Sequence, residues 1–94
     1  MRTIFKVTQK EIAKTHSIPS GSVFLSFHNE RPYITCYFLI PDTTSPLADI
    51  VIEGFETGEP ITPNQAKDNY LGTVIDRHGE SPYVVHYFWY YVEE

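Results

Sequence analysis

Residues 22–41 read SVFLSFHNERPYITCYFLIP, and this stretch decides the fold class. Its second half places an apolar side chain at every second position, which is the period of a half-buried β-strand. These side chains are Ile34, Cys36, Phe38 and Ile40. In the first half, we expect Val23, Leu25 and Phe27 to share one face in the same way. The polar residues HNERP between the halves predict a turn, so the stretch predicts a β-hairpin with one side in the core.

Shorter stretches on either side of this hairpin show the same alternation. They are RTIFKV at 2–7, LADIVIEG at 47–54, YLGTVID at 70–76 and PYVVHYFWYYV at 82–92. We expect Ile50 and Ile52 to be buried, and Gly54 and Gly58 to bracket a sharp turn or bulge. Strands at such short intervals predict a mainly β fold, an antiparallel meander that forms a sandwich or a partly open barrel. The 94 residues form a single domain, 1–94, because a second core would be too small to fold alone.

The segment between the first two strands allows two interpretations. Thr8 and Glu11 have the spacing of a helix capping box, which would begin a short helix. Too few apolar residues follow them to bury a helical face. We therefore favour an edge strand over residues 12–18, with Lys14 and His16 facing solvent.

Residues 62–69, TPNQAKDN, carry the strongest local helix signal. Thr62 suits an N-cap, Pro63 suits the first helical position, and Gln65 completes a capping box. We expect one or two helical turns here. The alternative fold class is therefore α+β.

The composition excludes several classes of function. Hydrophobic residues make up 41% of the chain and aromatic residues 15%, which is ample for a packed core. The formal net charge of −5 disfavours binding to polymeric nucleic acid. The single Cys36 excludes an intramolecular disulfide and a multi-cysteine zinc site. The first residues turn polar too early for a signal peptide, and no apolar run approaches the ~20 residues of a membrane span, so we expect no membrane association.

The sequence offers little evidence of catalysis. The histidines His16, His28, His78 and His86 have no close metal-binding spacing. Asp76 beside His78 resembles an acid–base pair, but both belong to a polar glycine turn that we expect to be solvated. Cys36 has no base in a known local signature, and no phosphate-binding glycine loop occurs. We therefore expect no enzyme, no cofactor and no metal.

The closing strand, 82–92, is apolar on both faces. One face carries Tyr83, Val85, Tyr87, Trp89 and Tyr91, and the other carries Val84, His86, Phe88, Tyr90 and Val92. Such a strand is covered on both sides. One face can pack on the domain's own core, and a partner chain would cover the other. We therefore expect a homodimer or higher oligomer with an interface formed by Tyr83, Tyr87, Trp89 and Tyr91.

Two kinds of binding site fit these residues. Exposed carboxylates could meet a basic partner surface: Asp49, Glu53, Glu56, Glu59, Glu93 and Glu94. Alternatively, aromatic rings and one cation could hold a small nucleotide: Tyr70, Arg77, His86 and Trp89. The acidity suits a basic protein surface better than it suits a phosphate, so we favour the first.

Three short motifs follow one another in the second half of the chain. They are Thr57, Gly58 and Ile61 in FETGEPI, then YLGT at 70–73, then Val85, His86 and Phe88. In order and spacing they resemble the G-T-G-x-x-I, Y-[IL]-G-T and apolar-His-x-[FY] motifs of a family of short uncharacterised proteins of tailed bacteriophages and prophages. The chain departs from that pattern in lacking the glycine directly before Thr57, and in having Val85 where an aromatic is common.

That family has no established activity, so the resemblance implies only a phage gene whose product acts in the cytoplasm of an infected bacterium. Small acidic phage proteins without catalytic motifs commonly act by binding. We therefore expect a non-enzymatic accessory protein that inhibits a host protein, such as an anti-phage defence complex. The alternatives are a sponge that sequesters a small nucleotide signal and a minor virion or assembly component.

Overall fold

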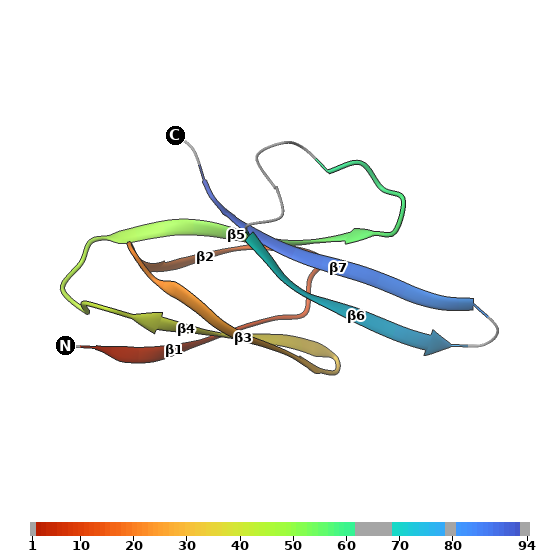
Figure 1. Cartoon of the computed structure of the whole chain (residues 1–94), viewed down its shortest axis with the longest axis horizontal. Helices are drawn as coiled ribbons and strands as arrows, with labels where there is room; N and C mark the ends of the chain where they lie inside the picture. The colour runs from red at the N-terminus through yellow and green to blue at the C-terminus, as the bar shows by residue number, and fades with distance from the viewer. Residues whose placement is uncertain (1, 62–68, 79–80, 93–94) are drawn as a thin grey trace.

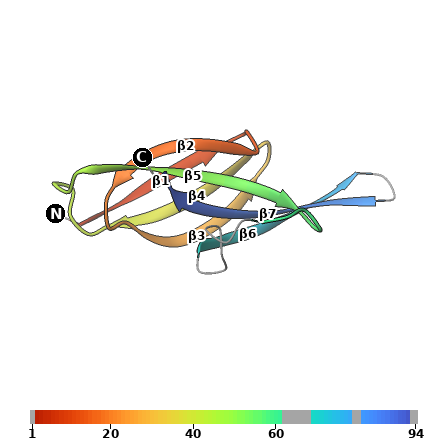
Figure 2. The same ribbon diagram turned by 90° about the horizontal axis from the view of Figure 1, so that it is seen from above.

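The protein folds into two antiparallel β-sheets that face each other. The computed structural model describes residues 2–61, 69–78 and 81–92, and its described elements are all strands. The three-stranded sheet has the order β1 (Thr3–Gln9), β4 (Tyr33–Ile40), β3 (Val23–Glu30). The four-stranded sheet has the order β2 (Ala13–Pro19), β5 (Leu47–Glu56), β7 (Ser81–Tyr91), β6 (Tyr70–His78). The two layers are visible in Figures 1 and 2, and they confirm the predicted mainly β fold in its sandwich form.

The core lies between the two sheets and contains the residues expected there. Six predicted core residues are at most 6% exposed: Ile34, Cys36, Phe38, Ile40, Ile50 and Ile52. Phe38 of β4 lies at the centre, with its ring edge-on to Phe24 of β3 at a centroid distance of 5.9 Å. Burying a side chain of this size stabilises the fold by about 1.5–3 kcal/mol. Strict alternation in the sequence was therefore a sound guide to β4 and β5.

The expected apolar face of β3 is wrong. Val23 is 52% exposed and Leu25 is 47% exposed, whereas Phe24 and Phe27 pack against the core. The register with β4 shifts between Phe24 and Ser26, as in a β-bulge. An extra residue in one strand moves the following side chains to the other face. Phe24 and Phe27 can therefore both point inward although they are three positions apart.

Two glycines mark close approaches. A Cβ atom at Gly72 of β6 would lie 2.3 Å from Cδ1 of Phe27, so the missing side chain makes room for a ring from the opposite sheet. Gly54 lies within the regular pairing of β5 with β7, where a Cβ atom would lie 2.5 Å from Cγ1 of Val85. Gly58 has a φ of 92° in the turn that follows β5. Gly58 is thus the predicted turn residue, and the expected turn or bulge at Gly54 is wrong.

The first connection confirms the edge-strand interpretation. β1 ends at Gln9, and β2 runs along the edge of the four-stranded sheet. Lys14 is exposed as expected, but His16 is half-buried and its Nε2 lies 2.8 Å from Oε1 of Gln9. Burial lowers the pKa of His16 below its usual value, and Lys14 lowers it further. The predicted helix over 62–69 lies almost wholly outside the described residues.

The β6–β7 hairpin extends beyond the sandwich. The pairing of β5 with β7 ends at Glu56 and Val85, whereas the pairing of β6 with β7 continues to His78 and Ser81. Beyond Val85, these two strands are therefore paired only with each other. We call residues 75–78 and 81–84 the β6–β7 ribbon; it projects at one end of the molecule, which measures 49 × 27 × 19 Å (Figures 1 and 2).

Candidate functional site

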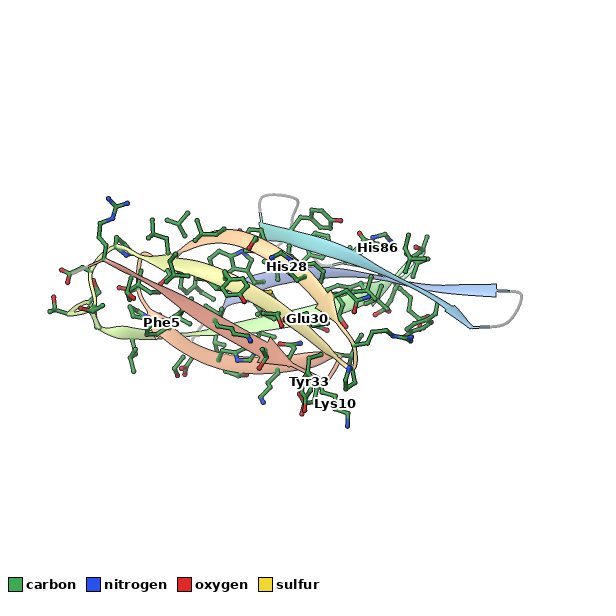
Figure 3. All side chains as sticks on the ribbon, turned by 90° about the horizontal axis from the view of Figure 1, so that it is seen from below. Phe5, Lys10, His28, Glu30, Tyr33 and His86 are labelled. Carbon is green, nitrogen blue, oxygen red and sulfur yellow. The ribbon has the colours of Figure 1, made fainter. Side chains whose placement is uncertain are left out.

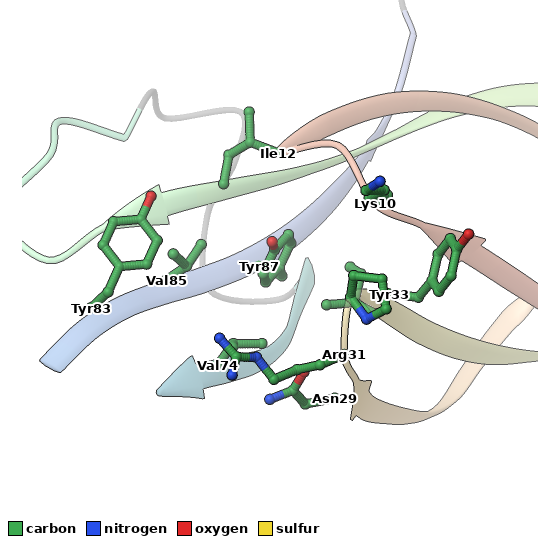
Figure 4. Close-up of a pocket in the computed structure, with 11 residues that line it drawn as sticks. Lys10, Ile12, Asn29, Arg31, Tyr33, Val74, Tyr83, Val85 and Tyr87 are labelled. Atoms are coloured by element: carbon green, nitrogen blue, oxygen red, sulfur yellow. The ribbon is translucent and has the colours of Figure 1, made fainter. Parts of the chain in front are cut away.

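A cleft opens at the base of the β6–β7 ribbon, where the two sheets diverge. It has a volume of about 690 Å³, and we call it the end cleft. Its lining comes from the β1–β2 connection, from strands β3 and β4 with the turn between them, and from strands β6 and β7: Lys10, Ile12, Asn29, Arg31, Pro32, Tyr33, Ile34, Val74, Tyr83, Val85 and Tyr87. Figure 4 shows the side chains of the β3–β4 turn opposite those of β7.

The end cleft has an apolar floor and a positive rim. Ile34, Val85 and Tyr87 belong to the hydrophobic core and are at most 8% exposed. Of the described residues that line the cleft, the charged ones are Lys10 and Arg31. Figure 4 shows the Arg31 side chain reaching from the β3–β4 turn toward Val74 of β6. The cleft of this acidic chain thus carries two cationic side chains among its described lining residues.

Two tyrosines of β7 present hydroxyl groups at this cleft. A hydrogen bond to the Glu56 side chain is the main cause of the raised pKa of Tyr83. Burial raises the pKa of Tyr87, and the hydroxyl of Tyr87 makes no hydrogen bond to any part of the chain that the structure describes. Both phenols therefore remain protonated at neutral pH. Tyr83 donates its hydrogen bond to Glu56, whereas Tyr87 can donate one to another acceptor.

The structure does not bring together the residues predicted to hold a nucleotide. His86 points from the outer face of β7, whereas Trp89 points inward and contacts Phe38 at 5.5 Å between ring centroids. The side chain of Arg77 lies outside the described residues. Tyr70 is near His86 but also lies on the outer face, so Trp89 cannot join them. Residues three apart on a strand face opposite sides, and this spacing could have excluded the set from the sequence.

His86 is instead held in a chain of hydrogen-bonding groups on the outer face of the four-stranded sheet. Its Nδ1 lies 3.0 Å from Oγ1 of Thr73, which also bonds to the hydroxyl of Tyr70. Its Nε2 lies 2.8 Å from Oγ1 of Thr57. This chain connects β6, β7 and the turn after β5. It places hydroxyl groups on both ring nitrogens of His86.

The histidines do not converge on a metal site. His28 lies on the three-stranded sheet with its Nε2 3.1 Å from Oγ of Ser26, whereas His86 belongs to β7 of the four-stranded sheet (Figure 3). Across the described ranges, no group of three or more His, Cys, Asp and Glu side chains could hold a metal ion. Within those same ranges, no helix has the length and apolar character needed to cross a membrane. Asp76 and His78 pair with residues of β7 in register, but their side chains lie outside the described part.

The predicted acidic residues divide into two groups. Asp49 accepts a hydrogen bond of 2.6 Å from Ser17, and Glu53 accepts one of 2.9 Å from the Tyr90 hydroxyl, both on the outer face of the four-stranded sheet. Glu56 and Glu59 lie together in the turn after β5, where the backbone NH of Glu56 donates to Oε1 of Glu59 at 3.1 Å. Both are exposed beside Tyr83, at the base of the β6–β7 ribbon. The predicted sites at Glu93 and Glu94 lie outside the described residues.

The tyrosines and tryptophan predicted to form an interface have different environments. Tyr87 is 8% exposed in the core, and Trp89 packs against the core from β7. Tyr83 is 49% exposed and Tyr91 is 44% exposed. Tyr83 and Tyr91 are therefore the members of this set that can meet a second chain.

Sequence reasoning missed the end cleft and its residues Lys10, Arg31 and Tyr33. Lys10 lies in the β1–β2 connection, Arg31 in the β3–β4 turn and Tyr33 at the start of β4, and no local motif connects them. A family model described as "Domain of unknown function (DUF7352)" matches residues 1–94. No curated protein and no solved structure matches the chain.

Proposed function

Since the chain belongs to this family of unknown function, we propose its role from its own geometry and from the phage resemblance of its motifs. It is a non-enzymatic accessory protein of a phage or prophage, and it inhibits a protein of the bacterial host by docking onto it. The site of action is the cytoplasm of the infected cell. A component of an anti-phage defence complex is the kind of target that this setting favours.

The projecting β6–β7 ribbon is the observation that carries this proposal. A two-stranded hairpin by itself is only marginally stable in water. Beyond its last pairing with β5, this one carries Ile75 at 53% exposure and Tyr83 at 49%. A projecting strand pair with exposed apolar side chains is suited to insertion into a groove of a partner, where aromatic residues contribute much of the binding energy.

The charge at the base of the ribbon favours a basic partner. Glu56 and Glu59 are both exposed there, close to Tyr83. Carboxylates at the rim of an interface steer association and select partners of opposite charge. Host proteins that hold nucleic acid have such basic grooves. The docking surface of this proposal therefore consists of Ile75, Tyr83, Glu56 and Glu59.

Retention of host proteins by tagged variants tests the proposal. Glu59→Lys reverses a charge at the ribbon base, and Asp42→Lys makes the same change in net charge in the β4–β5 connection, at the opposite end of the molecule (Figure 1). Wild type and Asp42→Lys should retain the same host protein from lysate, and Glu59→Lys and Ile75→Asp should lose it. Equal retention by all four proteins would contradict the proposal. Co-purification with virions in place of a host protein would favour a virion component, and turnover of a host metabolite by the pure protein would overturn the non-enzymatic role.

A further inference from the structure

We propose that a hollow on the outer face of the three-stranded sheet binds a neutral sugar ring. We call it the outer hollow, and its lining consists of Lys6, Thr8, Glu30, Tyr33 and Thr35. The docking surface of the proposed function lies instead at the β6–β7 ribbon of the other sheet. The inference therefore does not depend on the proposed function.

Strand pairing brings the lining residues of the outer hollow together. In the central strand β4, Thr35 pairs with Thr8 of β1, and Tyr33 pairs with Glu30 of β3. Because the intervening Ile34 belongs to the core, alternation turns Tyr33 and Thr35 outward. Figure 3 views the molecule from this side. The volume of about 320 Å³ lies at the lower end of the ~300–1,000 Å³ usual for ligand pockets, which suits a single ring.

The hydroxyl of Thr35 is the observation that points to a ligand. Thr35 is 1% exposed, and among the described residues its Oγ1 is the one buried side-chain nitrogen or oxygen atom without a hydrogen-bond partner. Buried hydroxyl groups normally have a partner. Rotation about χ1 exchanges Oγ1 with the methyl group of the same side chain, so the hydroxyl can turn toward the hollow that Thr35 lines. A ligand in the hollow would supply the missing partner.

The charges that line the outer hollow balance each other. Lys6 and Glu30 lie on the two edge strands of the sheet, with β4 between them. In the part of the chain that the structure describes, the two side chains form no ion pair with each other. The ammonium group donates hydrogen bonds, the carboxylate accepts them, and a threonine hydroxyl does both. Such a site favours neither a cation nor an anion, and it fits a ligand with many hydroxyl groups.

The ring of Tyr33 adds an aromatic surface beside these polar groups. Tyr33 is 48% exposed, so its ring is accessible to a ligand. A pyranose ring with equatorial hydroxyl groups has only C–H bonds on its two faces. These bonds carry a small positive charge and pack against the negative face of an aromatic ring. With one face on Tyr33, the hydroxyl groups of the sugar would point sideways, toward Lys6 and Glu30.

Titration with methyl β-D-glucopyranoside, followed by amide NMR, tests the inference. We expect saturable shifts at residues 6–8, 28–30 and 33–35, with a dissociation constant of about 10 mM or tighter. Glycerol has hydroxyl groups but no ring, and it should bind at least about tenfold more weakly. Glycine has both charges but neither ring nor hydroxyl group, and it should be weaker by a similar factor.

A substitution at Thr35 tests the role of its hydroxyl. Thr35→Val replaces the hydroxyl by a methyl group and should weaken sugar binding about threefold to tenfold. It should not lower the melting temperature, because the hydroxyl has no partner to lose in the free protein. Thr15→Val, at an exposed position of β2, is the control and should leave sugar binding unchanged.

Two further variants test the charges and the ring. Lys6→Ala/Glu30→Ala removes one positive and one negative charge and should weaken sugar binding at least about tenfold, because charge-assisted hydrogen bonds are lost. Lys14→Ala/Glu11→Ala makes the same change at exposed positions outside the hollow and should bind like the wild type. Tyr33→Leu should weaken binding about threefold to tenfold through the loss of the aromatic face.

Several results would overturn the inference. One is the absence of saturable shifts up to about 100 mM sugar. Another is a clearly lower melting temperature of Thr35→Val than of the wild type, which would show that the hydroxyl has a partner within the chain. Equal affinity for glycerol would show that the ring is not recognised, and binding of glycine in place of the sugar would assign the hollow to a zwitterion. If Lys6→Ala/Glu30→Ala unfolds, Tyr33→Leu is the deciding comparison, and unchanged binding by it would contradict the proposal.

Discussion

The indole ring of Trp89 lies edge-on to the ring of Phe38, with 5.5 Å between the ring centroids and 82° between the ring planes. Trp89 belongs to β7 and Phe38 to β4, so this contact joins the two sheets near the centre of the core. Edge-on aromatic pairs add about 0.5–1.5 kcal/mol to the effect of burial alone. The closing strand therefore uses its tryptophan to stabilise the fold of its own chain.

Replacing Trp89 by alanine should accordingly lower the free energy of unfolding by about 3 kcal/mol, because a large ring is removed from the packed interior. Urea unfolding followed by circular dichroism measures this change. Tyr91→Ala is the matched control on the same face of β7, where the side chain is 44% exposed, and its loss should be clearly smaller. Equal losses in the two variants would contradict the assignment of Trp89 to the core.

Adding a methyl group at Gly72 should destabilise the protein by about 1–3 kcal/mol, because it would press on the ring of Phe27. Thermal unfolding of Gly72→Ala gives the size of the effect. The double variant Gly72→Ala/Phe27→Leu provides a thermodynamic cycle, and the smaller leucine should recover part of the loss. Strictly additive losses would show that the two positions do not press on each other.

Cys36 should resist thiol reagents in the folded protein. It is 0% exposed, and burial raises its pKa to about 12. The unfolded chain loses this proton near its ordinary value of 9.0, so the contribution of Cys36 to stability is complete below pH 9 and is lost as the pH rises toward 12. Relative to Cys36→Ala, the wild type should lose about 1.4 kcal/mol per pH unit in that window. Rapid native-state labelling at pH 8 would contradict this burial.

Self-association remains a prediction. The structure shows which of the predicted interface residues on β7 are available to a second chain. Tyr83 and Tyr91 are exposed on β7, whereas Tyr87 lies in the core of its own chain and Trp89 packs against that core. Light scattering should show more than one chain per particle, and Tyr83→Ser/Tyr91→Ser should shift the population toward the monomer. A wild-type protein that stays monomeric at about 100 μM would contradict the expected dimer, because stable interfaces of standard size associate well below that concentration.

The sequence predicted the parts of the fold that follow from strict alternation. In YITCYFLI and LADIVIEG, only one of the two sets of alternate residues lacks polar side chains. The sequence therefore predicts which face of β4 and of β5 is buried. In VFLSF both alternating sets contain apolar residues, and the register with β4 shifts between Phe24 and Ser26, so that Phe24 and Phe27 point inward. Which face of β3 is buried depends on its packing against the other sheet, and the sequence of one strand does not reveal that packing.

The candidate sites were less predictable for the same reason. Glu56 and Glu59 were predicted as binding residues from their carboxylates, and the structure shows that both are exposed. The end cleft depends on where the β1–β2 connection and the β3–β4 turn meet β7, and neither Lys10 nor Arg31 is unusual within its own turn. The predicted grouping of His86 with Trp89 failed because β-strand geometry places them on opposite faces.

Photo-crosslinking in host cells tests the proposed docking function most directly. A photoreactive phenylalanine derivative at Ile75 of the ribbon should crosslink to one host protein, and Glu59→Lys should abolish that product. The same group at Ile4, which is 59% exposed on the other sheet, serves as the control and should give no such product. Crosslinking at Ile75 alone would support inhibition through the β6–β7 ribbon. Equal crosslinking at Ile75 and Ile4, or no host product at either position, would contradict it.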